Sequence, residues 1–250
     1  MNYIFTLVLA CMSLSISAQN EGMITFQEKV DVHRRLPEDR QEYKEMIPQF
    51  RTTNYELHYN ENESSYKASK VQEEPSGPGS GGGSGRGMRM RMGGAADRNV
   101  YKNIEDNMLV DSREFMTKPF LIRGTLDEQQ WKIADGQKQV LDYLCLKAVY
   151  TDSADTYIAW FTPQIPISNG PAEFAGLPGM ILELDMNDGG RTITAVEVTE
   201  GEVAKDILKE PKKGKEVTSE EYREIVRRKM EEMRAERGGS GNGHMMIIRQ

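Results

Sequence analysis

The chain lacks an excess of positive charge, because 39 acidic residues outnumber 32 basic residues and leave a net charge of −7. Nucleic acids select basic surfaces, so this balance disfavours a nucleic-acid partner. No internal stretch reaches the roughly 18 consecutive apolar residues of a membrane-spanning helix. The three histidines, His33, His58 and His244, have no metal-ligand spacing, and no Gly-x-Ser-x-Gly elbow marks a serine nucleophile. We therefore expect no cofactor, no transmembrane span and no catalytic residues.

Cysteine is nearly absent, with Cys11 and Cys145 the two in the chain. Cys11 lies in an apolar N-terminal run that ends in small residues at 15, 17 and 18, a pattern typical of a secretory signal peptide. Cleavage after Ala18 would leave Cys145 alone, which excludes a disulfide within the mature chain. The leucines on either side of Cys145 indicate a buried, unreactive thiol.

The pattern predicts one domain after the signal peptide. We assign residues 1–18 to the signal and residues 19–250 to a single α+β domain. Residues 73–96 are rich in glycine, serine and methionine without periodicity, and predict a disordered loop. Residues 238–243 predict a second flexible loop. We expect the mature protein in the periplasm or associated with the outer membrane.

Alternation of apolar and polar residues predicts a sheet. It is clearest from Ile24 to His33 and recurs in short runs separated by turn residues up to Thr199. Consecutive strands with short turns favour an antiparallel meander, and we expect eight to eleven strands. Our predicted fold class is α+β, with a strongly curved antiparallel sheet resembling an open half-barrel and two covering helices.

Two segments predict those helices. The first begins near Pro37 and has a short apolar stripe at Tyr43, Met46 and Ile47. The second begins with a capping box formed by Thr218 and Glu221 and continues to about residue 237. Its apolar face should dock on the sheet.

Residues 157–186 contain the most shape-determining side chains in the chain. Gly176-Leu177-Pro178-Gly179 contains the start of a predicted type II turn. If the turn begins at Leu177, proline occupies its second position and glycine its third, as this turn type favours. Asn169-Gly170-Pro171 predicts another sharp reversal upstream. This segment should form a rigid corner at one end of the sheet.

The same segment resembles a known family. The residues that carry the resemblance are Ala159-Trp160-Phe161-Thr162, Ile165-Pro166, Gly170-Pro171, Phe174 and Gly176 to Ile181, preceded by Tyr143 to Ala148. They are similar to the signature of the GLPGLI family of exported bacterial proteins, over about residues 131–186. Met180 stands where the family has leucine, a change that conserves volume. The resemblance implies export and assigns no activity.

We therefore predict a non-catalytic cell-envelope binding protein. Its partner would be an apolar ligand or another envelope protein, held at the Gly-Leu-Pro-Gly end of the sheet. The apolar groups and glycine that surround the two turns form the predicted site: Trp160, Phe161, Phe174, Leu177, Pro178, Gly179 and Met180.

Two alternatives remain open. Soft ligands at Met88, Met90, Met92, His244 and Met245 could bind Cu(I), although arginines between the methionines would repel a cation. Carboxylates near the turn, Glu173, Glu183 and Asp185, could perform acid–base hydrolysis if buried. Solvated charges on a strand face explain the carboxylates more simply.

Overall fold

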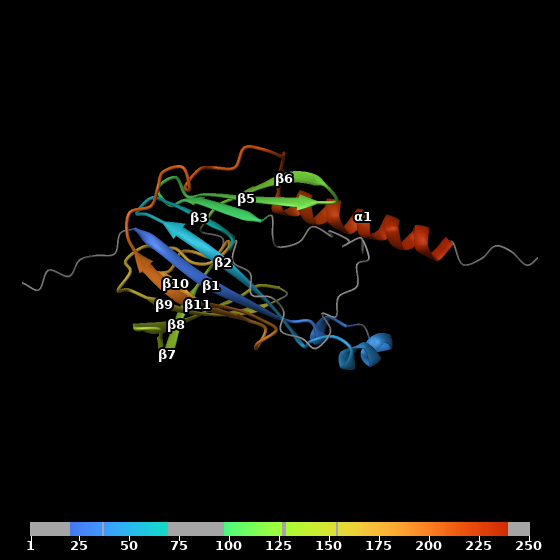
Figure 1. The fold of residues 1–250 in the computed structure, drawn as a ribbon, viewed down its shortest axis with the longest axis horizontal. Helices are drawn as coiled ribbons and strands as arrows, with labels where there is room; N and C mark the ends of the chain where they lie inside the picture. Colours follow the sequence, from blue (N-terminus) through green and yellow to red (C-terminus); the bar gives the residue numbers. More distant parts are fainter. Residues whose placement is uncertain (1–20, 37, 70–97, 127–128, 154, 240–250) are drawn as a thin grey trace, which may run out of the picture.

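The computed structural model describes residues 21–36, 38–69, 98–126, 129–153 and 155–239. These residues form one twelve-stranded sheet, in the order β12-β6-β5-β4-β3-β2-β1-β11-β10-β9-β8-β7 (Figure 1). The strands are β1 (Gly22–Asp31), β2 (Phe50–Tyr59), β3 (Glu63–Ala68), β4 (Asn99–Asn103), β5 (Met108–Phe115), β6 (Lys118–Gly124), β7 (Lys132–Val140), β8 (Tyr143–Thr151), β9 (Thr156–Thr162), β10 (Met180–Met186), β11 (Arg191–Glu200) and β12 (Lys215–Thr218). One α-helix, α1 (Ser219–Gly239), and two 3-10 segments, η1 (His33–Arg35) and η2 (Glu38–Glu45), complete the described part.

The predicted α+β class was wrong. The fold is mostly β, and its sheet is neither closed nor strongly curled, with β12 and β7 as its two edges. The meander itself is confirmed, because every pairing is antiparallel except the short parallel pair of β12 with β6. The hairpin turn between β7 and β8 contains Leu141, whose φ of 51° is left-handed.

The prediction of two covering helices was also wrong. The segment after Pro37 forms the 3-10 segment η2 rather than an α-helix, and Met46 beyond it is 76% exposed. Three apolar residues in a charged segment offer too little surface to bury a helix against a sheet.

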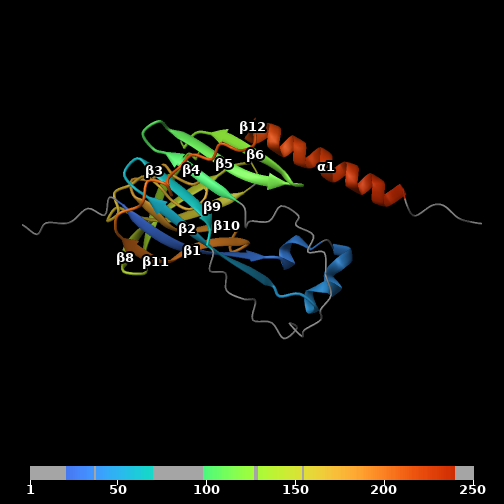
Figure 2. The same ribbon diagram turned by 45° about the horizontal axis from the view of Figure 1, so that its top comes forward.

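Helix α1 begins as predicted but covers an edge rather than a face. The Thr218 amide donates to Glu221 Oε2 (2.8 Å) and the Glu221 amide to Thr218 Oγ1 (3.2 Å), which is the expected capping box. Tyr222 and Ile225 pack against an apolar cluster of β6 and β12. The C-terminal part of α1 continues past the sheet (Figure 2). No helix in the described ranges has the length and apolar character needed to cross a bilayer.

The segment 163–179, between β9 and β10, packs on the sheet and shares its main core. Ile165, Phe174 and Leu177 are buried in the same cluster as residues of β1, β2, β8 and β10. The amide of Met180 donates to Ile165 O (3.0 Å), and that of Ile181 to Asn169 O (2.9 Å). This segment therefore is a fixed part of the core.

The Gly-Leu-Pro-Gly corner is rigid, but its turn type differs from the prediction. Gly179 N donates to Leu177 O (2.8 Å), a three-residue turn centred on Pro178, where a type II turn was expected. Gly176 and Gly179 have φ of +90° and +147°, values that favour glycine. A Cβ on Gly179 would lie 2.2 Å from Thr162 O, so the backbones of β9 and the turn approach too closely for any side chain.

We expect Gly179→Ala to destabilise the protein more than Gly189→Ala. Both glycines have positive φ, but a Cβ at Gly189 would meet nothing within 4 Å. The Gly189 variant should cost about 1 kcal/mol for backbone strain alone, and the Gly179 variant at least about 2 kcal/mol more. Urea unfolding of both variants measures the difference, and equal losses would contradict the close approach at Thr162.

Candidate binding cleft

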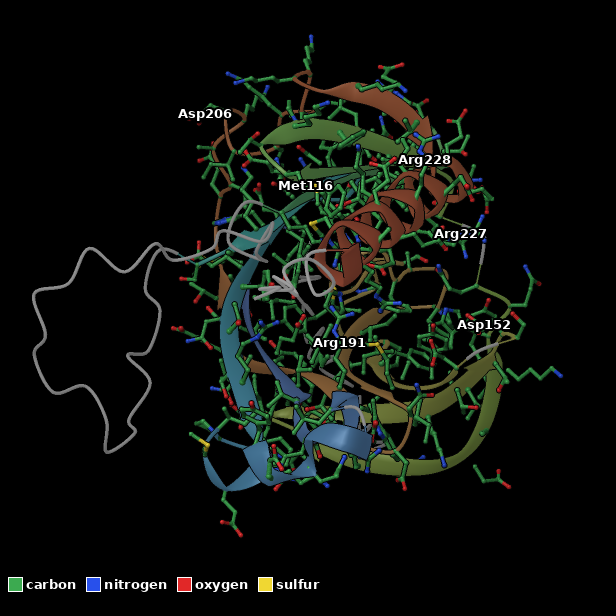
Figure 3. All side chains as sticks on the ribbon, turned by 90° about the vertical axis from the view of Figure 1, so that its right-hand side faces the viewer. Met116, Asp152, Arg191, Asp206, Arg227 and Arg228 are labelled. Atoms are coloured by element: carbon green, nitrogen blue, oxygen red, sulfur yellow. The ribbon has the colours of Figure 1, made fainter. Side chains whose placement is uncertain are left out.

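Two neighbouring cavities share lining residues from the segment 163–179. The first lobe, about 320 Å³, lies among β5, the β8–β9 turn and the start of α1; the second lobe, about 330 Å³, lies among the end of β1 and the β10–β11 turn. Tyr157, Glu173 and Phe174 line both lobes. We call the two lobes together the Glu173 cleft. In Figure 3, Arg191 of the second lobe lies between α1 and η2, and Asp152 of the first lobe lies near the margin.

A cluster of six paired ions borders the cleft. Arg98 donates from Nη2 to Asp111 Oδ2 (2.7 Å) and to Glu173 Oε2 (2.6 Å). Arg113 also pairs with Asp111, at 2.5 Å, and Arg191 pairs with Glu28, at 2.7 Å. We call Arg98, Arg113, Arg191, Glu28, Asp111 and Glu173 the ion-pair cluster. Its three positive and three negative charges balance.

Glu173 is the member of the cluster that faces both lobes. Its side chain is 31% exposed, and Arg98 holds one of its two carboxylate oxygens. Burial raises the pKa of this carboxyl, but the charges of Arg98, Arg191 and Arg113 outweigh burial and lower the pKa to about 2. Glu173 is therefore a permanent carboxylate near neutral pH and accepts hydrogen bonds without releasing or storing a proton.

Lys102 anchors the segment from beneath. Its side chain is fully buried in β4, and its Nζ donates to Gly170 O (2.6 Å) and Phe174 O (3.0 Å). These carbonyls flank Glu173 in the chain. Burial lowers the pKa of Lys102 to about 7, opposed by the charge of Glu173 and assisted by that of Arg98. One ammonium group thus ties the residues that line the cleft to the sheet.

Aromatic side chains form the rest of the first lobe's wall. Tyr150 and Tyr157 stack with ring centroids 5.4 Å apart, and Tyr157 and Phe174 meet at 5.5 Å. Trp131 lies behind, 5.8 Å from Tyr150 and 6.3 Å from Phe174, and its Nε1 donates to Ala175 O (2.8 Å). We call these four residues the aromatic wall. Because the wall is hydrogen-bonded and stacked, its shape is fixed in advance of any ligand.

The residues predicted to hold an apolar ligand separate in the structure. Phe161, Leu177 and Met180 are buried in the core, and Pro178 is exposed. Trp160 is half-buried beneath the ammonium of Lys138, which lies 4.9 Å from its ring centroid. Gly179 forms the close contact with Thr162, and Phe174 alone among the seven lines the Glu173 cleft.

The residues of the two alternatives lie elsewhere or outside the described chain. Met88, Met90, Met92, His244 and Met245 fall outside the described residues, as do the signal peptide, the loop 73–96 and residues 240–243 of the second loop. Within the described ranges, no three His, Cys, Asp or Glu side chains gather to hold a metal.

Of the three hydrolase candidates, Glu173 lines the cleft, whereas Glu183 and Asp185 have structural partners elsewhere. Glu183 pairs with Lys138 at 2.5 Å, and Asp185 Oδ1 accepts from the Gly189 amide (2.7 Å) in the β10–β11 turn. Neither lines the Glu173 cleft. Cys145 is buried, as predicted, and burial raises the pKa of its thiol to about 11.

Sequence reasoning missed Arg98, Lys102, Asp111 and Arg191. A signal was present for two of them, because each directly follows a short apolar pair: Lys102 follows Val100 and Tyr101, and Asp111 follows Leu109 and Val110. Buried charges are paired or hydrogen-bonded, so such positions mark places where the interior becomes polar.

Comparisons with known proteins match only part of the chain by sequence. A model of a family described as a protein of unknown function (Porph_ging) matches residues 152–183, which include Tyr157, Glu173 and Phe174. No curated protein matches the chain. Two solved structures of PNGF-II, in the C2 and P21 space groups, are similar in fold, with TM-scores of 0.54 and 0.55 at 13% identity. They cover 82% and 83% of this chain, which spans about a third of their length (32% and 33%).

We expect Arg98→Met to destabilise the protein by about 3 kcal/mol, because the buried end of Glu173 would lose its cationic partner. Arg227→Met, which breaks the exposed pair with Glu224 on α1, should cost less than about 1 kcal/mol. Urea denaturation at pH 7 compares the two. Equal, small losses would mean that the ion-pair cluster is effectively solvated.

We expect stability to rise with pH between pH 7 and 9 through Lys102. The unfolded lysine keeps its proton up to its ordinary pKa of 10.5, whereas folded Lys102 releases it near pH 7. The unfolded state therefore binds more protons in this window, and the unfolding free energy should increase by at most about 1.4 kcal/mol per pH unit. Lys102→Met should flatten this dependence, as measured by urea titrations at several pH values. A slope unchanged in the variant would assign the effect to other groups.

Proposed function

We propose that this chain is an exported, non-catalytic binding protein whose ligand or partner segment occupies the Glu173 cleft. The observation that carries the proposal is the cleft itself, with two lobes of 320 and 330 Å³ that meet at Tyr157, Glu173 and Phe174. Each lobe lies at the lower end of the size range of small-molecule sites, about 300–1,000 Å³. The fixed aromatic wall and the ion-pair cluster supply both apolar contact and polar specificity.

The binding role follows the sequence-based expectation, with the site moved. Leu177 and Met180 contribute to the core that supports the cleft, and Phe174 connects that core to its surface. The Gly-Leu-Pro-Gly corner then serves to hold the segment 163–179 in place. A purely apolar ligand suits this site less well, because Glu173 and arginines line it alongside the aromatic rings.

Two features argue against particular catalytic roles, general-acid catalysis by Glu173 and nucleophilic catalysis by Cys145. Glu173 has a pKa of about 2, so it has no proton to donate as a general acid near neutral pH. The buried thiol of Cys145 has a pKa of about 11 and does not line the Glu173 cleft. Membership of the GLPGLI family and export to the periplasm or outer membrane are part of the same proposal. The motif at residues 157–186 and the apolar N-terminal run support them.

We expect native mass spectrometry of protein purified from the periplasm to show a bound species. Ser219→Trp places an indole at the first lobe without touching the ion-pair cluster, and should reduce the bound fraction severalfold. Glu197→Trp, on an exposed position of β11, is the matched control and should retain it. An empty wild-type mass, or equal occupancy in Ser219→Trp, would rule out the cleft as the binding site.

A further inference from the structure

Most charges around the Glu173 cleft are paired with a charge of opposite sign. At its margins Arg34 pairs with Asp31 and Arg223 with Glu220, while the carboxylates of Asp152 and Asp155 accept from the Tyr157 hydroxyl. Arg98 spans Asp111 and Glu173, Arg113 pairs with Asp111, and Arg191 pairs with Glu28. A ligand with a net charge would introduce an unpaired ion beside this balanced cluster, or would have to displace one of its members. Either event costs several kcal/mol for partly buried ions. Beside the ion-pair cluster, where the two lobes meet, the electrostatics therefore favour an uncharged part of the ligand.

The polar groups of the lining both accept and donate hydrogen bonds. Glu173 has one carboxylate oxygen beyond the one that Arg98 holds. Gln129 Oε1 and Arg191 Nε are buried and have no hydrogen-bond partner within the described ranges. Unsatisfied buried polar atoms are uncommon, and each costs about 1–3 kcal/mol. A hydroxyl group serves such a mixed lining well because it donates and accepts at the same atom.

The aromatic wall adds a flat apolar surface next to these polar groups. Tyr157 and Phe174 line both lobes, and Tyr150 lines the first. Their stacking and tilted contacts fix the ring planes, so a ligand loses little by ordering them. A saturated ring that bears hydroxyl groups can pack the C–H bonds of its faces against the aromatic wall. The hydroxyls at its rim can then form hydrogen bonds with the polar groups.

The two-lobed shape of the Glu173 cleft favours an elongated ligand. The lobes lie on either side of Tyr157, Glu173 and Phe174, and their volumes are nearly equal at 320 and 330 Å³. One ring in each lobe, joined past Glu173, would use the whole cleft.

We infer that the Glu173 cleft binds an uncharged carbohydrate chain of at least two sugar rings, with Glu173 accepting a hydrogen bond from a sugar hydroxyl between the lobes. This inference rests on the proposed binding function and names the class of its ligand.

An array of immobilised oligosaccharides tests the inference. It should carry uncharged chains, sulfated and carboxylated chains, and, as separate spots, acidic and basic peptides. The wild-type protein should bind one or more of the uncharged chains. Glu173→Gln, which keeps the side-chain size, should weaken that binding about tenfold, as expected for losing a hydrogen bond to a charged acceptor. Gln129→Ala is a second variant outside the ion-pair cluster, and should weaken the same binding. Glu197→Gln, at an exposed position of β11, is the matched control and should bind as the wild type does.

Three outcomes would overturn the inference: binding only to charged chains or peptides, no binding to any spot, or undiminished binding by both Glu173→Gln and Gln129→Ala. These outcomes are distinct from failure of the binding function itself. A bound species that Ser219→Trp removes, in a protein that binds no uncharged chain, would refute the carbohydrate and leave the cleft as a binding site. An empty wild-type mass would refute the binding function.

Discussion

The attachment of the segment 163–179 to the sheet depends on one buried ammonium group. Lys102 Nζ holds the carbonyls of Gly170 and Phe174, and the residue between them that faces the cleft is Glu173. Arg98, four residues earlier on the chain, holds the Glu173 carboxylate itself. Backbone and side chain of the same short segment are thus fixed by two cations that come from the start and the end of β4. The position of the aromatic wall follows, because Phe174 belongs to both the wall and the anchored backbone.

This arrangement places paired charges beside the apolar core, where the loss of one partner is costly. A buried ion pair contributes little net stability compared with apolar packing, but removing one partner leaves a charge without compensation. The ion-pair cluster therefore specifies geometry more than it adds stability. The ion pairs hold the polar groups in fixed positions when the cleft is empty, so the surface of the cleft is preorganised.

Much of the architecture could be predicted from alternation and turn residues. The first strand, the β2–β3 hairpin and the β10–β11 hairpin follow from period-two patterns, and the start of α1 follows from Thr218 and Glu221. The helix predicted after Pro37 failed because a stripe of three apolar residues says nothing about whether a surface exists to bury it. The prediction of a strongly curved sheet failed for a related reason. The bend of a sheet depends on how its faces are packed, and strand patterns do not contain that information.

The site was less accessible to sequence reasoning. Arg98 and Glu173 are separated by 75 residues, and no local pattern joins them. The resemblance drew attention to residues 157–186, which proved to contain Tyr157, Glu173 and Phe174, but it favoured the apolar members of the segment. Lys102 and Asp111 could have indicated a polar site, since a charge within a buried strand requires a partner from elsewhere in the fold.

An open sheet of twelve strands has two free margins, and unprotected margins would allow copies of the chain to join by strand pairing. At one margin, β12 has four residues and leads directly into α1, so little backbone is offered to a neighbour. At the other, β7 loses register with β8 between Ala134 and Gln137, and Gly136 there has a φ of +143°. Short length and irregular register are established defences against strand addition. Both margins of the open sheet therefore offer little regular backbone for pairing with another strand.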